Sequence, residues 1–226
     1  MASNISEFER ITKLLENKNV CLVGNSIELL NHSKGAFIDS HDVVIRMGRG
    51  APTAKHYHKI GDKFSIWASG FLRNEYYKKF PTEWQNMPIL LNRTRMYLNK
   101  PREADIDVPY CTMFSDAELL EIYEEFNYQD ASLLGRPSNG FIVLLWLIKK
   151  AWVWKSLTII GFDFFAKQAP FKVGAQNPFS WHLPKNRVDE IPHNALEERE
   201  YALEMSRNGI INWVMLSDLK EEVLEL

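Results

Sequence analysis

Short apolar runs of strand length alternate along this chain with segments in which apolar residues recur at helical spacing. The runs predict buried strands at 19–24, 43–47, 64–67, 87–91, 157–161 and 210–216. Helical spacing covers 6–18, 116–126, 138–150 and 195–208, and a further helix begins at 27–30. Strands that alternate with helices predict an α/β fold, in which a mainly parallel sheet is flanked by helices.

The 226 residues contain neither repeats nor a low-complexity linker, so we expect a single domain over residues 1–226. The most apolar stretch, Phe141 to Ile148, is followed by two lysines and is far shorter than the ~20 apolar residues of a spanning helix. The first residues lack the apolar run of a signal peptide. Two cysteines, Cys21 and Cys111, make no disulfide framework. We therefore expect a cytoplasmic protein, and contact with a membrane surface stays open.

Several common ligand signatures are missing from the sequence. A formal net charge of -2 gives no electrostatic basis for a nucleic-acid partner. The dinucleotide pattern G-x-G-x-x-G and the phosphate loop G-x-x-x-x-G-K-[ST] are both absent. Asp163 stands without a D-x-D pattern, and histidine and cysteine residues form no metal-type cluster. We therefore expect no nucleic-acid partner and no metal.

Three polar segments stand where predicted strands end or predicted helices begin. They are Gly24-Asn25-Ser26, Ser138-Asn139-Gly140 and Gly161-Phe162-Asp163. Ligands of parallel sheets bind outside the carboxyl ends of the strands, and helix N-termini attract phosphate. We therefore predict one nucleotide site built from these segments, although plain helix capping explains each helix start about equally well.

Two histidines, His182 and His193, lie eleven residues apart in a polar, proline-rich stretch. Histidines in such loops are more often ordinary surface residues than catalytic groups. Glu198, however, follows His193 by five residues, near the start of a predicted helix. A carboxylate there can orient the imidazole and raise its basicity, so this pair is a candidate general base.

Taken together, the segments resemble the sialylmotifs of glycosyltransferase family 29, the animal-type sialyltransferases. Residues 21–26, 37–39, 42–47 and 51–53, with Tyr57 and Gly61, are similar to the large motif. Residues 136–144 running to 157–162 resemble the small motif, 181–184 the third motif, and 193–198 with 208–212 the very small motif. The four motifs occur in the family's order and cover roughly two thirds of the chain.

The resemblance implies a Rossmann-like variant of the GT-A fold and a metal-independent, inverting transfer. The CMP-sugar donor is then a substrate, no cofactor is needed, and the acceptor is a glycan or glycolipid. His193 would be the base, supported by Glu198, and His182 would sit at the phosphate. Donor binding is implied for Gly24, Asn25, Ser26, Arg46, Ser138, Asn139, Gly140, Gly161 and Phe162. We expect the acceptor loops at 93–110 and 166–179.

The chain departs from the family pattern at identifiable positions. Gly48 stands where the family usually has asparagine, and Asn139 replaces the threonine of the usual Ser-Thr-Gly. The second cysteine of the family disulfide corresponds to Trp154, and we expect no anchor or stem of the kind that Golgi members have. These departures favour a bacterial or viral relative, whose donor sugar is sialic acid or another CMP-activated 2-keto acid such as Kdo.

Two other hypotheses stay open. A non-catalytic nucleotide- or glycan-binding module on the same fold would keep Asn25 and Ser138, but it would not need His193 with Glu198. A Rossmann-like methyltransferase or dehydrogenase would need a glycine-rich first turn, which the segment around Asn25 does not supply.

Overall fold

In a computed structural model, the described residues are 6–48, 52, 54–70, 82, 86–92, 109–128, 137–164 and 195–216. The strands of this part of the chain form one sheet in the order β5-β4-β3-β2-β1-β6-β7. They are β1 (Asn19–Val23), β2 (Val43–Met47), β3 (Ile66–Ser69), β4 (Ile89–Leu91), β5 (Cys111–Thr112), β6 (Ser156–Ile160) and β7 (Asn212–Val214). Every described pairing is parallel, which confirms the predicted α/β fold.

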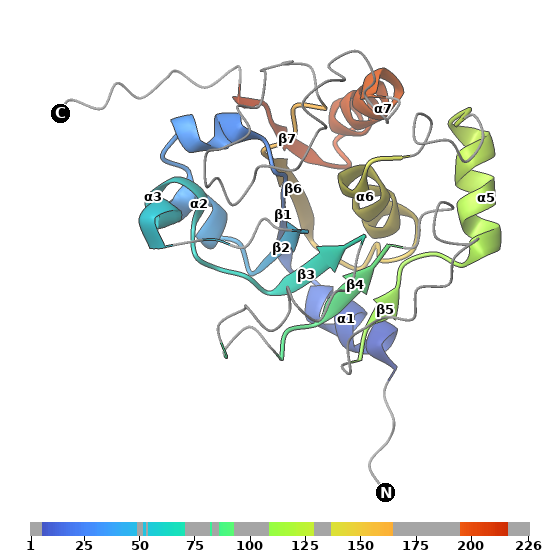
Figure 1. Cartoon of the computed structure of the whole chain (residues 1–226), viewed down its shortest axis with the longest axis horizontal. Coiled ribbons are helices and arrows are strands. Elements are labelled where there is room, and N and C mark those ends of the chain that lie inside the picture. Colours follow the sequence, from blue (N-terminus) through green and yellow to red (C-terminus); the bar gives the residue numbers. More distant parts are fainter. Residues whose placement is uncertain are drawn as a thin grey trace, which may run out of the picture.

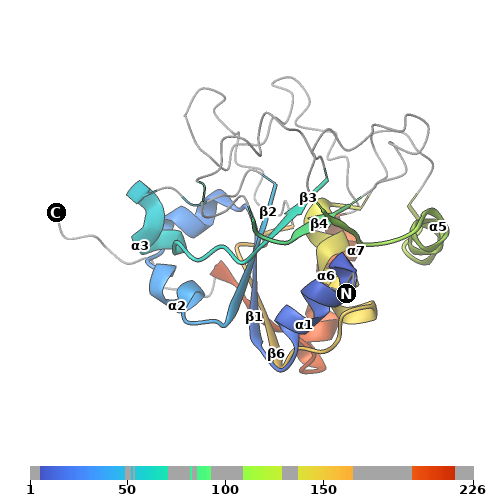
Figure 2. The ribbon, with the colours of Figure 1, turned by 90° about the horizontal axis from the view of Figure 1, so that it is seen from below.

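Helices cover both faces of the sheet (Figures 1 and 2). One face carries α1 (Glu7–Leu15), α5 (Asp116–Glu125), α6 (Asn139–Lys149) and α7 (Ala195–Arg207). The other face carries the 3-10 helix η1 (Ile27–Asn31) with α2 (Gly35–Asp39) and α3 (Tyr57–Ile60), which the 3-10 turn η2 (Ala54–His56) precedes. The fold therefore has three layers, helices on a sheet on helices.

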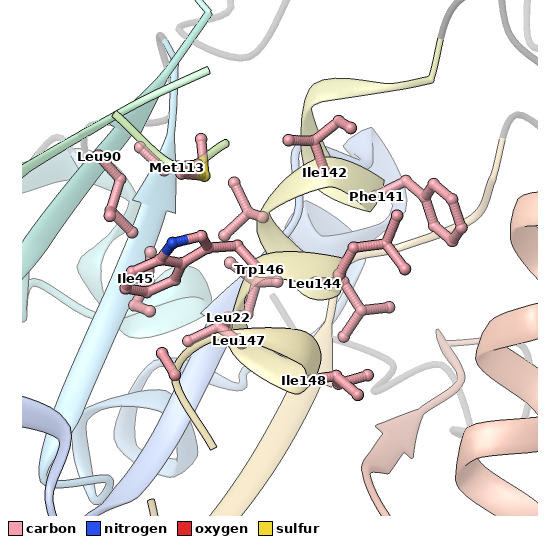
Figure 3. Packing of buried hydrophobic residues seen from close by; sticks show 14 of the residues in the cluster. Leu22, Ile45, Leu90, Met113, Phe141, Ile142, Leu144, Trp146, Leu147 and Ile148 are labelled. Carbon is pink, nitrogen blue, oxygen red and sulfur yellow. The ribbon is translucent and has the colours of Figure 1, made fainter. Parts of the chain in front are cut away.

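Helix α6 is the centre of the larger hydrophobic core. Nine of its residues, Gly140 to Ile148, are buried. A helix that is apolar all round must be covered on every side. Figure 3 shows Trp146 beside Ile45 of the sheet, while Phe141 lies on the opposite side of the helix. There the ring of Phe141 makes an edge contact with Tyr201 of α7, at 5.5 Å between centroids.

The thiols of Cys21 and Cys111 are free, as expected from the sequence, and the structure shows that both are buried. Cys21 lies in β1 and Cys111 in β5, with three strands between them. Strands of a sheet are spaced by about 4.8 Å, which separates the two residues by roughly 19 Å. A disulfide requires Cα atoms within about 7 Å, so the fold rules out a bridge between them. Among the described helices, none is long and apolar enough to span a bilayer.

Candidate functional site

The strand order reverses between β1 and β6, because the chain runs from β1 outward to β5 and then returns to the other side of β1. The loops that follow these two strands are joined at the carboxyl edge. The amide of Gly24 donates to the carbonyl of Ile160 at 2.7 Å, and that of Ser26 to the carbonyl of Gly161 at 3.0 Å. The Ser26 hydroxyl donates to the carboxylate of Asp163 at 2.9 Å. This is the place where parallel sheets bind ligands.

Two glycines allow the polar segments to approach one another. A Cβ at Gly24 would overlap the carbonyl oxygen of Gly161. A Cβ at Gly140 would lie 2.7 Å from Cε1 of Phe162, so the ring of Phe162 packs directly on the start of α6. The structure therefore brings the three predicted segments together and explains these glycines by packing. Donor contacts by Gly24, Gly140, Gly161 and Phe162 stay predictions.

Asn25 fastens the loop after β1 to the end of β2. Its Nδ2 donates to the carbonyl oxygen of Met47 at 3.2 Å, and the side chain is half-buried. Within the described part of the chain, no donor reaches its Oδ1. The side chain is thus held in place by one end and offers an acceptor at the other.

Arg46 lies on the opposite face of the sheet. Side chains alternate along a strand, so Met47 faces α6 whereas Arg46 faces α3. Its Nε donates to the carbonyl of Lys63 at 2.9 Å, its Nη2 donates to that of Ile60 at 2.7 Å, and the residue is 0% exposed. These bonds hold the segment between α3 and β3 against β2. We therefore leave Arg46 out of the donor site proposed below.

The start of α6 is tied to the ends of neighbouring strands. Ser138 caps the helix, and its Oγ accepts the amide of Phe141 at 3.1 Å. Asn139 is the first helical residue, and its Oδ1 accepts Nδ2 of Asn92 at 3.1 Å. Asn92 directly follows β4, and its amide donates to the carbonyl of Ser69 in β3 at 2.9 Å.

Glu198, in the first turn of α7, is fully buried and receives three hydrogen bonds. Its Oε1 accepts the Tyr128 hydroxyl at 3.0 Å and the Ser138 backbone amide at 2.7 Å. Its Oε2 accepts the Ser138 hydroxyl at 2.6 Å. One carboxyl group therefore joins α7 to the start of α6. The partners that the structure gives Glu198 are Ser138 and Tyr128, and its pairing with His193 stays a prediction.

The surroundings of Glu198 shift its protonation. Burial raises the pKa of Glu198 to about 7, although the hydrogen bonds from Ser138 and Tyr128 act in the opposite direction. Burial first, and the Glu198 charge second, raise the pKa of Tyr128, which keeps Tyr128 a hydroxyl donor. When Glu198 is protonated, its Oε2 can donate to the Ser138 hydroxyl instead of accepting from it.

The structure brings the predicted segments 24–26, 138–140 and 161–163 together at one edge of the sheet. His182 and His193 lie outside the described residues, as do 93–108 and 166–179 of the expected acceptor loops. Within the described ranges, no three His, Cys, Asp or Glu side chains are grouped to hold a metal ion.

Two residues of this site, Asn92 and Tyr128, were missed by the sequence reasoning. Asn92 follows an apolar run directly, just as Gly24 does, so a polar residue at a strand end was a usable signal. Tyr128 follows the end of α5 and carries no comparable signal, because its role depends on Glu198, which lies 70 residues further along the chain.

In a comparison with known protein families, part of the chain matches one family. Residues 7–86 match the family model of glycosyltransferase family 29 (sialyltransferase), which confirms the predicted resemblance. The matched range holds the segments similar to the large motif, whereas the other three motifs lie beyond it. No curated protein matches the chain.

Solved structures with a similar fold include two of mammalian sialyltransferases. The one in complex with Gal-beta-1-3GalNAc-ortho-nitrophenol is 18% identical, with a TM-score of 0.55, and the match covers 95% of this chain and 75% of that chain. The other is 17% identical, with a TM-score of 0.57, and the match covers 95% of this chain and 74% of that chain. At this identity the similarity is one of fold, and it confirms the predicted Rossmann-like architecture.

Proposed function

We infer that this chain is a sialyltransferase-like glycosyltransferase, and we propose that it moves an acidic 2-keto sugar from a CMP-sugar to a glycan hydroxyl. The observation that carries the proposal is that two polar segments, Asn25-Ser26 and Ser138-Asn139-Gly140, both lie against Met47 and the turn at 161–162, at the carboxyl edge of the sheet. The match of residues 7–86 to the sialyltransferase family supports the same assignment.

The chemistry of the donor fits the start of α6. A CMP-sugar of this class carries two anionic groups, the phosphate and the sugar carboxylate. The backbone amides of Asn139 and Gly140 stand in the first turn of α6, where amides have no acceptor within the helix. Such a helix start favours anions through these amides and through the helix dipole.

We propose a single displacement with inversion. The acceptor oxygen forms a bond to the anomeric carbon while the bond from that carbon to the phosphate oxygen breaks, and CMP leaves with the electron pair. His193 takes the proton of the attacking hydroxyl, and His182 stabilises the leaving phosphate. No cofactor enters this balance.

The acceptor and the compartment are also proposals. We propose a glycan or glycolipid acceptor, and the Gal-beta-1-3GalNAc unit bound in one similar structure is a suitable first compound to test. Both thiols are free, which is consistent with a reducing compartment, and we propose the cytoplasm.

A donor screen by release of CMP tests the proposed function. We expect turnover with CMP-sialic acid or CMP-Kdo in the presence of an acceptor, and a thermal shift with CMP. A non-catalytic module would show the thermal shift without turnover. A shift with S-adenosylmethionine or NAD in place of CMP would instead indicate a methyltransferase or a dehydrogenase.

Excess EDTA is expected to leave the transfer rate unchanged. The physical reason is that the proposed site opposes the phosphate charge with the start of α6 and with His182, so no bound cation is required. The rate is measured as CMP release before and after dialysis against EDTA. Loss of activity that Mg²⁺ or Mn²⁺ restores would contradict the proposal.

Asn25→Ala is expected to weaken CMP binding about threefold to tenfold, because it removes one ligand hydrogen bond and loosens the loop that Met47 fixes. Isothermal calorimetry with CMP measures the effect. Asn19→Ala, at the amino edge of the sheet, is the matched control and should bind CMP like the parent. If Asn25→Ala also binds like the parent, the nucleotide does not contact this loop.

A further inference from the structure

Asn92 and Asn139 form a pair of amide side chains at the edge of the proposed donor site. Nδ2 of Asn92 donates to Oδ1 of Asn139 at 3.1 Å. Asn92 is only 2% exposed, whereas Asn139 is half-buried at the first position of α6. The part of the pair that a ligand can reach therefore belongs to Asn139.

The pair leaves one buried polar atom unused. Oδ1 of Asn92 is buried, and among the residues that the structure describes it has no hydrogen-bond partner. Unpartnered buried acceptors are costly and uncommon in folded proteins, so each requires an explanation. A leucine of similar size would fill the same space without this cost, and packing alone therefore does not account for an asparagine after β4.

We propose that Asn92 is a positioning residue, which holds the Oδ1 of Asn139 so that the NH₂ group of Asn139 is presented to an anionic group of the donor. The oxygen and nitrogen of an amide diverge from one carbon, so fixing the oxygen against Asn92 frees the nitrogen for the accessible side. The backbone amides at the start of α6 favour an anion at the same place. The anion is the phosphate or the sugar carboxylate. This inference rests on the proposed function and adds a residue outside the motifs.

The proposal is tested by isothermal calorimetry on two variants. For each variant, the affinities for cytidine, CMP and CMP-sialic acid are measured. Asn92→Leu removes the support of Asn139 and also removes the unused acceptor. We expect about threefold to tenfold weaker binding of the anionic ligand, with an unchanged or higher melting temperature. Asn139→Asp keeps the hydrogen bond from Asn92 but presents a carboxylate oxygen, so we expect the anionic ligand to bind more than ~10-fold more weakly. Cytidine should bind both variants like the parent.

Comparison of the three ligands shows which anionic group of the donor, the phosphate or the sugar carboxylate, Asn139 contacts. Weaker binding of CMP assigns the phosphate, and weaker binding of CMP-sialic acid alone assigns the carboxylate. Asn212→Leu and Asn212→Asp, on strand β7, which four strands separate from β4, are the control variants. If Asn92→Leu fails to fold, Asn92→Asp replaces it. That carboxylate accepts the NH₂ of Asn139 and turns it away from the ligand, so the same loss of affinity is expected.

Two results would overturn the inference. One is parent-like affinity of the Asn92 variants for all three ligands. The other is an equal loss for all three, cytidine included, together with a lower melting temperature, because that pattern marks a packing residue. A parent protein that binds neither CMP nor CMP-sialic acid would reject the proposed function itself, and the inference with it.

Discussion

His193→Ala is expected to lower kcat by about 10²–10⁴-fold while the affinity for CMP stays nearly unchanged. CMP is a good leaving group, and the anomeric carbon of a 2-keto sugar readily carries positive charge. The acceptor hydroxyl is the weaker partner, because it must lose a proton as it attacks. Histidine begins with a pKa near the working pH, which suits that step. Single-turnover transfer from CMP-sialic acid measures the effect.

In the sequence, His193 precedes Ala195, the first residue of α7, by two positions. The first turn of α7 is in turn held to the start of α6 by Glu198 and Ser138.

His182→Ala provides the comparison for this experiment. It should also slow transfer, but through the leaving phosphate, and it should therefore weaken CMP binding, which His193→Ala should not. If His193→Ala transfers sugar within about threefold of the parent, His193 is an ordinary surface residue and the proposed mechanism is wrong.

Glu198→Ala is expected to lower the free energy of unfolding by roughly 2–6 kcal/mol, because it leaves the Ser138 amide and the Tyr128 hydroxyl unpaired in a buried place, at about 1–3 kcal/mol each. The start of α6 would lose its link to α7, so we expect transfer activity to fall as well. Denaturant unfolding and CMP release measure the two effects.

Glu198→Gln is the matched variant, because it resembles the protonated carboxyl group. Its Oε1 can accept from Tyr128 and from the Ser138 amide, and its NH₂ can donate to the Ser138 hydroxyl. We expect stability within about 1 kcal/mol of the parent and transfer within about threefold. If Glu198 instead acts through its charge on His193, Glu198→Gln will lose activity while it stays folded. Hydrogen bonding to Ser138 would then not be enough to explain the role of Glu198.

Stability should also depend on pH through Glu198. Burial raises its pKa to about 7 from 4.5, so between these values the folded protein holds a proton that the unfolded chain has released. The part of the stability that comes from this pKa shift is thus fully present below about pH 4.5 and is lost as the pH rises through about 7, whereas the hydrogen bonds from Ser138 and Tyr128 are counted separately. Unfolding curves across this range should show the trend in the parent and lack it in Glu198→Gln. An identical pH dependence in both proteins would contradict the shift.

The sequence by itself determined most of the strands and helices from which the three layers of this protein are built. Strand β2 at Val43–Met47 occupies the predicted residues, and α6 and α7 begin within one residue of their predicted starts, because burial on one or all faces imposes a periodicity that is visible locally. Helices α2 and α3 and strand β5 escaped prediction, since five, four and two residues are too few to display a period.

Only the tertiary structure decided which partners the polar residues at the carboxyl edge of the sheet contact. Arg46 stands in the sequence among residues similar to the large motif, yet strand alternation turns it to the face of α3. Glu198 meets Ser138 across 60 residues, and Asn92 meets Asn139 across 47. A periodic pattern reports whether a side chain is buried, whereas a hydrogen-bond partner depends on which strand ends the sheet order places side by side. That order is fixed by packing between distant segments, and no local stretch of sequence carries it.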